Sequence, residues 1–225
     1  MNACGVAVNQ EKGENMNHDA PSNYEIQRER TRELFFTYDL SEIVDKLHLD
    51  SDEEYVYLTY AGWKYRLRKS DAVLETDNGG VTEFHLSDTE DAMTIYDILA
   101  YSKPGASPSG EMVQIQNLSR VQNASSYAGE GIYERYGKEY AGRGKELEAA
   151  CKALGGQAFG KGDVAMRIPL FQDVSVAISF WDADDEFPPV LNLYFDKNML
   201  QYVHYETVWY SANGLMQHIK KVIEP

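Results

Sequence analysis

Apolar side chains alternate with polar or small ones along two neighbouring segments, and this alternation limits the fold more strongly than any other feature. A spacing of two places successive side chains on opposite faces of a strand. Gln172-Asp173 separates the two segments, so we expect strands over 163–171 and 174–181 that form an antiparallel hairpin. A third strand is expected over 190–195, after an acidic loop. The apolar positions of the hairpin are Val164, Met166, Ile168, Leu170, Val174, Val176, Ile178 and Phe180.

A second set of strands is predicted in the first half of the chain. Ala61-Gly62 is expected to form a tight turn between the first pair of strands. Asp77-Asn78-Gly79-Gly80 supplies the positive-φ residues that a hairpin turn between the second pair requires. This half therefore predicts an antiparallel meander, with strands over 55–60, 63–68, 73–76 and 81–84.

Helical spacing and helix-start signals flank these strands. Ser22 with Glu25, and Ser87 with Glu90, form capping-box patterns, which satisfy free backbone N–H groups at a helix start. They predict helices from Ser22 to about Tyr38 and from Ser87 to just before Lys103. Apolar spacing predicts further helices over 40–47, 133–140, 147–154 and 205–223. The stripe of the last helix consists of Val208, Trp209, Ala212, Leu215, Met216, Ile219, Val222 and Ile223.

Hairpins and packed helices, without regular strand–helix–strand alternation, predict an α+β fold: antiparallel sheet(s) packed with helices in a single domain. We expect this domain to span residues 22–225. Residues 1–21 are rich in Asn, Glu and Gly and lack periodicity, so they are expected to form a disordered N-terminal tail. Hydrophobic residues make up 43% of the chain, which is enough to bury a core without disulfides or a structural metal.

Charge and composition argue against several classes of partner. The net charge of −15 repels a phosphate backbone, and the one compact basic run, 64–69, alternates as the solvated face of a strand. We therefore expect no nucleic acid. No apolar stretch approaches the roughly 20 residues of a membrane helix, and residues 1–21 lack the pattern of a signal peptide. Two isolated thiols, Cys4 and Cys151, fit a reducing cytoplasm.

No known catalytic motif is complete in the sequence. Gly155–Gly162 resembles a phosphate-binding loop, but Gly162 stands where Ser or Thr is required, and the segment follows a helix instead of a strand. We expect a flexible connector there. The five histidines show no metal-ligand spacing, and His204 is expected to be a surface or helix-start residue. Cys151 falls within an apolar stripe, which gives no support for a nucleophile.

The strongest candidate site is the acidic loop Trp181–Pro189, which lies between two apolar strands. Its ligand-binding candidates are the two aromatic residues, the four carboxylates and an upstream arginine: Trp181, Asp182, Asp184, Asp185, Glu186, Phe187 and Arg135. Clustered carboxylates attract divalent cations, and paired carboxylates can also divide their pKa values for acid–base chemistry. The candidate metal ligands are Asp182, Asp184, Asp185, Glu186 and Asp196.

Three hypotheses follow for this loop. The first is a binding module that holds an unknown small molecule or protein, which the absence of a catalytic signature favours. The second is a divalent-metal-dependent enzyme of hydrolase type. The third is a structural loop, stiffened by Pro188-Pro189, whose acidic residues pair with Arg135 or Arg167 or cap local backbone amides.

The loop and several upstream segments also resemble an uncharacterised family of anaerobic bacteria and archaea, the domain of unknown function 3786. The resemblance extends from Tyr24 to Ile223, and it implies a single cytoplasmic domain without an assigned reaction. Some relatives resemble proteins with an added cysteine-rich iron–sulfur domain, and since this chain has only two cysteines, we expect no iron–sulfur cluster. The segments that carry the resemblance are Tyr133–Gly137, Leu154–Gly156, Gly162-Asp163, Ile168–Leu170, Trp181–Pro188 and Tyr194–Asp196.

Overall fold

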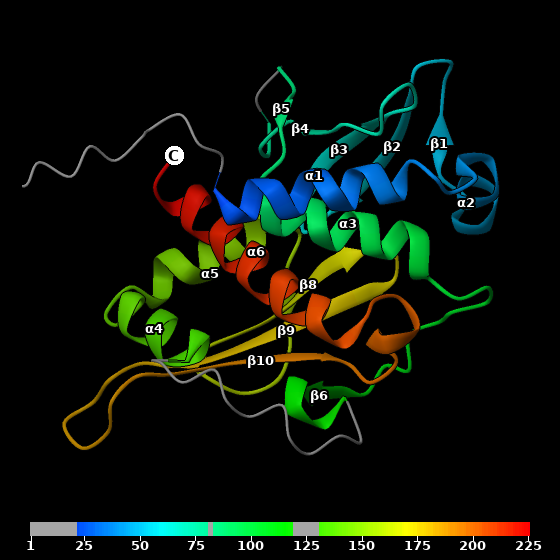
Figure 1. The fold of residues 1–225 in the computed structure, drawn as a ribbon. Helices are drawn as coiled ribbons and strands as arrows, with labels where there is room; N and C mark the ends of the chain where they lie inside the picture. The colour runs from blue at the N-terminus through cyan, green and yellow to red at the C-terminus, as the bar shows by residue number, and fades with distance from the viewer. Residues whose placement is uncertain (1–21, 81–82, 119–130) are drawn as a thin grey trace, which may run out of the picture.

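Two antiparallel sheets form the framework of the protein (Figure 1). The computed structural model describes residues 22–80, 83–118 and 131–225. Strands of the first sheet follow one another in chain order: β1 (Asp50–Ser51), β2 (Tyr55–Tyr60), β3 (Trp63–Arg68), β4 (Leu74–Thr76) and β5 (His85–Leu86). The second sheet has the order β6 (Met112–Gln114), β10 (Val190–Asp196), β9 (Val174–Trp181), β8 (Val164–Phe171) and β7 (Gln157–Ala158).

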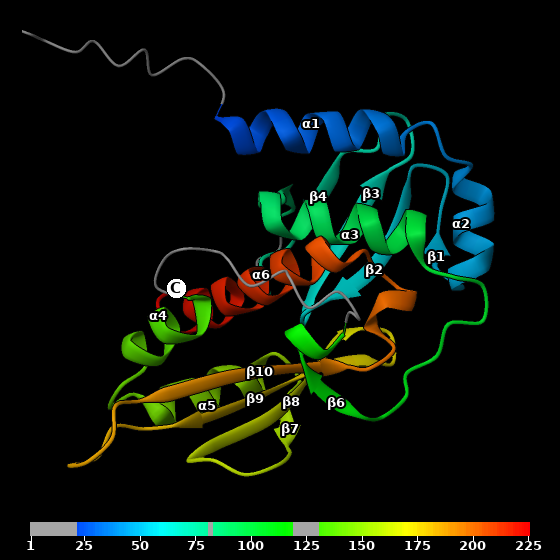
Figure 2. The same cartoon turned by 60° about the horizontal axis from the view of Figure 1, so that its bottom comes forward.

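Helices pack between and beside the sheets. Two of them, α3 and α6, contact each other along the middle of the molecule, and α1 packs on the far side of α3 (Figures 1 and 2). Helix α5 packs on β8, and α4 packs on β10. The described helices are α1 (Asn23–Phe35), α2 (Leu40–Leu47), α3 (Thr89–Tyr101), α4 (Ile132–Glu139), α5 (Gly144–Ala153) and α6 (Tyr205–Ile223), with short 3₁₀ turns at Ile115–Asn117 and Met199–Gln201. The α+β class with antiparallel sheets is thus confirmed.

The apolar stripe of α6 forms the centre of the core. Val208, Ala212, Leu215, Met216 and Ile219 are fully buried, and the two sheets and the helices share one cluster of buried side chains. Burial of this kind stabilises a fold by about 25 cal/mol per Å² of apolar surface removed from water. The bounds 205–223 that the spacing predicts for this helix are the observed ones.

The tight turn between β2 and β3 joins the two sheets. Ala61 and Gly62 both have positive φ, of 46° and 82°. The Ala61 N–H donates to the Leu170 carbonyl at the end of β8 (2.8 Å). A Cβ atom on Gly62 would lie 2.8 Å from the Cα of Leu154, so only glycine permits this close approach. Ala61 is therefore buried against the second sheet, whereas Gly62 stays exposed.

One predicted strand is wrong. The partner of β4 is β5, with Thr76 opposite His85, and not a strand over 81–84. Asp77 keeps the chain beside the start of β3, since its N–H donates to the Lys64 carbonyl and its Oδ1 accepts the Lys64 N–H. Pairing resumes only after the loop has left this contact. Val81 and Thr82 lie outside the described residues.

The two capping boxes differ in outcome. The box of Ser22 and Glu25 is present, with both reciprocal hydrogen bonds, although α1 ends at Phe35 instead of Tyr38. The box of Ser87 and Glu90 is wrong, because the Ser87 N–H continues the ladder to Leu74 and α3 begins at Thr89.

The predicted disordered tail, residues 1–21, lies outside the described part. Among the residues that the structure describes, no helix has the length and hydropathy needed to span a bilayer.

Candidate functional site

The acidic loop is the tip of the β9–β10 hairpin, which extends away from the rest of the molecule (Figures 1 and 2). We call residues Trp181–Pro189 the β9–β10 tip. It lies beside α4, where a Cβ atom on Gly137 would come within 3.3 Å of the Pro189 carbonyl. The hairpin register runs to the edge of the tip, with Trp181 opposite Val190. Two long strands thus hold the tip in a fixed position relative to the core.

Two of the four carboxylates fix the backbone of the tip. Oδ1 of Asp184 accepts the N–H groups of Glu186 (2.9 Å) and Phe187 (2.7 Å), and the Asp184 N–H donates to the Phe187 carbonyl (3.1 Å). These backbone hydrogen bonds lower the pKa of Asp184. The Asp182 carboxylate accepts the Gly142 N–H (2.9 Å), which ties the tip to the segment after α4. Asp182 and Asp184 are thus used in shaping the tip.

The other acidic side chains of the tip point to solvent. Within the described residues, the carboxylates of Asp185 and Glu186 make no hydrogen bond or ion pair, and both residues are exposed. Two aromatic side chains accompany them, since Trp181 is 49% exposed and Phe187 65% exposed. Large apolar side chains at such exposure, next to unpaired charges, are typical of surfaces that contact a partner.

Asp196 does not join this cluster. It lies at the opposite end of β10 and is buried, at 2% exposure. Its carboxylate accepts the N–H and hydroxyl of Ser109 and the N–H groups of Gly110 and Asn198, at 2.8–3.0 Å. Burial pushes the pKa of Asp196 upward, but these hydrogen bonds outweigh burial and lower the pKa. The carboxylate holds the loop before β6 against the end of β10.

The described residues offer no assembled metal site. Nowhere among them do three or more His, Cys, Asp or Glu side chains gather in an arrangement suited to a metal ion. Asp182, Asp184, Asp185 and Glu186 share the tip, but two of them are engaged with backbone N–H groups. The metal-dependent hydrolase therefore stays a prediction from the sequence, without support from the geometry.

The two candidate arginines contact other groups. Arg135 donates to Oδ1 of Asn213 on α6 (3.0 Å), and its guanidinium lies 4.5 Å from the ring centre of Tyr136. Arg167 lies over the ring of Phe159 at 3.7 Å. Neither contact involves a carboxylate of the tip. One part of the structural hypothesis is observed, namely that Asp184 accepts hydrogen bonds from nearby backbone amides.

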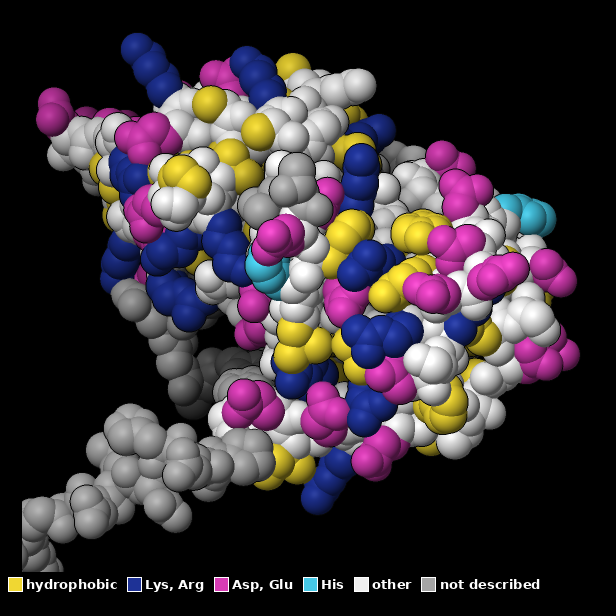
Figure 3. Space-filling model, turned by 90° about the horizontal axis from the view of Figure 1, so that it is seen from above, with side chains coloured by type: hydrophobic (Ala, Val, Ile, Leu, Met, Phe, Trp, Pro, Cys, Tyr) yellow, Lys and Arg dark blue, Asp and Glu magenta, His cyan; other side chains and the backbone are white. Residues whose placement is uncertain are grey.

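On the basic face of β3, Lys64 is exposed, and Arg66 and Arg68 are half-buried. Basic, acidic and hydrophobic side chains are mixed on the upper surface of the molecule (Figure 3). Arg66 and Arg68 both bind Glu75 at 2.7 Å, and the Arg66 guanidinium lies between the rings of Tyr55 and Phe84. The predicted alternation of β3 is thus observed, and its arginines are paired with a carboxylate.

Sequence reasoning missed two groupings of polar side chains. One is a buried cluster of Tyr65, Asp91 and His218, linked by contacts of 2.7–3.2 Å. The other is the pair of Asp97 and His204, with 2.7 Å between Oδ1 and Nδ1. The members come from distant segments, so no spacing rule reveals them. The only sequence signal is His204 at a helix start, and His204 is indeed the N-cap of α6.

Comparison with known proteins leaves the reaction unassigned. No curated protein and no solved structure matches the chain. A family model described as Domain of unknown function (DUF3786) matches residues 39–218. That range contains the β9–β10 tip and both polar groupings. Because the match covers most of the chain, the protein belongs to this family of unknown function.

Proposed function

We propose that the protein is a binding module that uses the β9–β10 tip to hold a basic segment of a partner protein. The observation that carries this proposal is that the four acidic residues of the tip fall into two pairs with different contacts. Asp182 and Asp184 shape the loop, whereas Asp185 and Glu186 are exposed and make no contact with the described residues. The second pair is thus available to a partner.

Charge supports a cationic partner. The chain has a net charge of −15, which attracts basic proteins over a distance of about one Debye length. Asp185 and Glu186 add two unpaired charges at a projecting point. Charged groups of this kind raise the rate of association and select the sign of the partner.

The aromatic side chains supply the apolar part of the contact. Phe187 and Trp181 are more exposed than core aromatics, and they lie on the same tip as the free carboxylates. Buried aromatic anchors commonly dominate the binding energy of an interface. The backbone hydrogen bonds of Asp184 keep the tip ordered before binding, which lowers the entropy lost in the complex. We propose the cytoplasm as the location, where a free thiol such as that of Cys151 stays reduced.

The proposal is tested by capture of partners from cell extract on immobilised protein. We expect a captured protein to be lost with the double substitution Asp185→Asn and Glu186→Gln, and with Phe187→Ser. The matched control is Asp173→Asn, which removes one exposed carboxylate from the turn at the other end of the same sheet. Capture with the control should equal that of the unchanged chain.

The captured protein is then bound in purified form at 50 and 300 mM salt. We expect weaker binding at high salt for the unchanged chain and a smaller salt effect for the double variant, since screening acts on the removed charges. Equal capture by all variants, or an acidic captured protein with no salt effect, would reject the tip as the binding surface.

A further inference from the structure

A groove on the other side of the core from the β9–β10 tip has the features of a small-molecule site. It lies between α1, α3 and the start of α6, and it encloses about 350 Å³. Its walls are mainly apolar and aromatic, with Leu34 and Tyr38 from the α1 side and Met93 and Tyr96 from α3. Volumes of roughly 300–1,000 Å³ are typical of ligand pockets, and a few placed polar groups usually fix the ligand.

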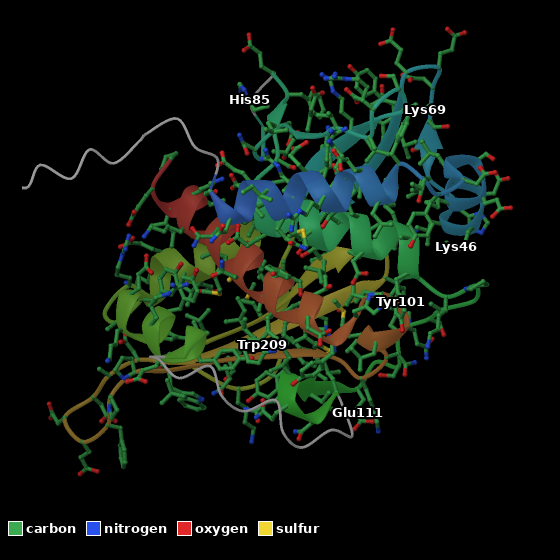
Figure 4. The ribbon with its side chains drawn as sticks, in the orientation of Figure 1. Lys46, Lys69, His85, Tyr101, Glu111 and Trp209 are labelled. Atoms are coloured by element: carbon green, nitrogen blue, oxygen red, sulfur yellow. The ribbon has the colours of Figure 1, made fainter. Side chains whose placement is uncertain are left out.

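Two such polar groups in the groove are Asp97 and His204. The Asp97 carboxylate accepts the backbone N–H of His204 at Oδ2 (2.8 Å) and contacts the ring Nδ1 at Oδ1 (2.7 Å). Tyr101 lies at the last turn of α3 (Figure 4). Its ring packs against the imidazole of His204, with 3.8 Å between the ring centres. The imidazole is thus held in one orientation by two contacts, although its side chain is 57% exposed.

The carboxylate also fixes the donor and acceptor roles of the ring. An ionised carboxylate only accepts, so Nδ1 of the neutral ring carries the proton. Nε2 is then a hydrogen-bond acceptor, and within the described residues it has no partner. An acceptor in this position selects ligands that carry an O–H or N–H group.

A tie between helices does not account for this arrangement. The backbone N–H of His204 is by itself enough to connect α6 to Asp97, and any residue other than proline would provide it. The second contact orients an exposed ring, and Tyr101 covers one of its faces. An exposed imidazole held in one orientation is suited to bind a ligand.

We propose that the groove binds a small hydroxylated aromatic molecule, with its ring against the apolar wall and its hydroxyl donating to Nε2 of His204. This site is separate from the β9–β10 tip, and it does not depend on the proposed partner binding. The walls supply aromatic contacts from Tyr38 and Tyr96, and the ring of His204 supplies a directional hydrogen bond.

Phenol and anisole are the probes, because the O-methyl group of anisole removes the donor and leaves the ring. Each is titrated into the full chain while the ¹⁵N shifts of the His204 ring are followed, at a pH at which they report a neutral ring. We expect phenol to bind roughly five-fold more tightly than anisole, as one added hydrogen bond predicts. Phenol should move the Nε2 signal of His204 most.

Two variants separate recognition from structure. In Asp97→Asn the amide oxygen takes the backbone N–H of His204, so the NH₂ group faces Nδ1 and the ring proton moves to Nε2. The preference for phenol over anisole should fall toward one while the chain stays folded. In His204→Phe the wall is kept and the acceptor is lost, with the same expected effect.

Equal binding of phenol and anisole by the unchanged chain would overturn the proposal. Retention of the phenol preference in His204→Phe would overturn it as well, because the preference would then arise elsewhere. A failure of Asp97→Asn to fold does not affect this second comparison.

Discussion

The imidazole of His218 stacks on the indole of Trp63, with 3.6 Å between the ring centres and 14° between the planes. His218 is completely buried in α6, and its Nδ1 donates to the Ala61 carbonyl (3.0 Å). Its Nε2 lies 2.9 Å from Oδ2 of Asp91, the oxygen that also accepts the Tyr65 hydroxyl (2.7 Å). Stacking and hydrogen bonds together join the first sheet to α3 and α6.

Replacing His218 should therefore destabilise the protein strongly. His218→Ala removes a buried partner of the Asp91 carboxylate and leaves the Ala61 carbonyl unsatisfied. Breaking such a buried pair reduces the free energy of unfolding by about 3 kcal/mol. Urea unfolding measures the loss, and His85→Ala, at an exposed position, serves as control. A loss below about 0.5 kcal/mol, which is usual for surface positions, would contradict this role.

Asp196 should give the protein an acid-sensitive contribution to stability. Its pKa in the folded state lies below that of an ordinary aspartate, so the ionised form stabilises the fold above pH about 4. This contribution is lost as the pH falls through the folded-state pKa. Asp196→Asn should lower the free energy of unfolding at pH 7 by about 2 kcal/mol, because an NH₂ group then faces a backbone N–H. The variant should also show a flatter pH dependence below pH about 4.

Urea unfolding at pH 7 and at several acidic pH values tests this expectation. Asp173→Asn removes a carboxylate from an exposed turn and is the matched control. If both variants lose stability equally at every pH, the hydrogen bonds to Asp196 have no special role.

The acceptor at position 184 should determine the order of the β9–β10 tip. Asp184→Ala removes the oxygen that accepts the N–H groups of Glu186 and Phe187, and both amides should exchange faster with solvent. Asp184→Asn keeps an accepting oxygen without the charge, so exchange should stay slow. Amide hydrogen exchange measured by NMR distinguishes the two variants. Equal exchange in both would mean that the tip is ordered by other contacts, such as that of Asp182 with Gly142.

The thiol of Cys151 should be unreactive in the folded protein. Burial raises its pKa to about 12, so almost no thiolate forms at neutral pH. In a Cys4→Ser background, a thiol reagent such as DTNB should label Cys151 only after denaturant is added. Rapid labelling of the native chain would show that α5 opens readily from the core.

Local sequence patterns predicted most helices and strands, because burial of one face of an element leaves a regular spacing of apolar residues in its own sequence. The strands over 55–60, 63–68 and 174–181 have the predicted bounds, since alternate side chains on them are buried. The two-residue strands Asp50–Ser51 and Gln157–Ala158 were missed, as they exist only through pairing with a neighbour. Ser87 shows the same limit, because its bond to Leu74 replaced the predicted cap.

The candidate site was predicted only in part for the same reason. The sequence places Asp182, Asp184, Asp185 and Glu186 together, but it does not show which of them bind backbone N–H groups. Asp196 belongs to β10, the strand that follows the tip, but it is the last of seven residues and so lies at the end of β10 that is far from the tip. The pair of Asp97 and His204 depends on helices that meet only in the folded core.

The Ala61-Gly62 turn bears on the order in which the protein is completed during synthesis. Its hydrogen bonds go to Leu170 and His218, which the ribosome adds long after the turn itself. The first sheet can pair its own strands early, but its inner end stays exposed until the last helix has emerged. A chain whose synthesis pauses before α6 would therefore expose apolar surface that α6 later covers. Such a chain is prone to aggregate, and this is the stage at which a chaperone would be needed most.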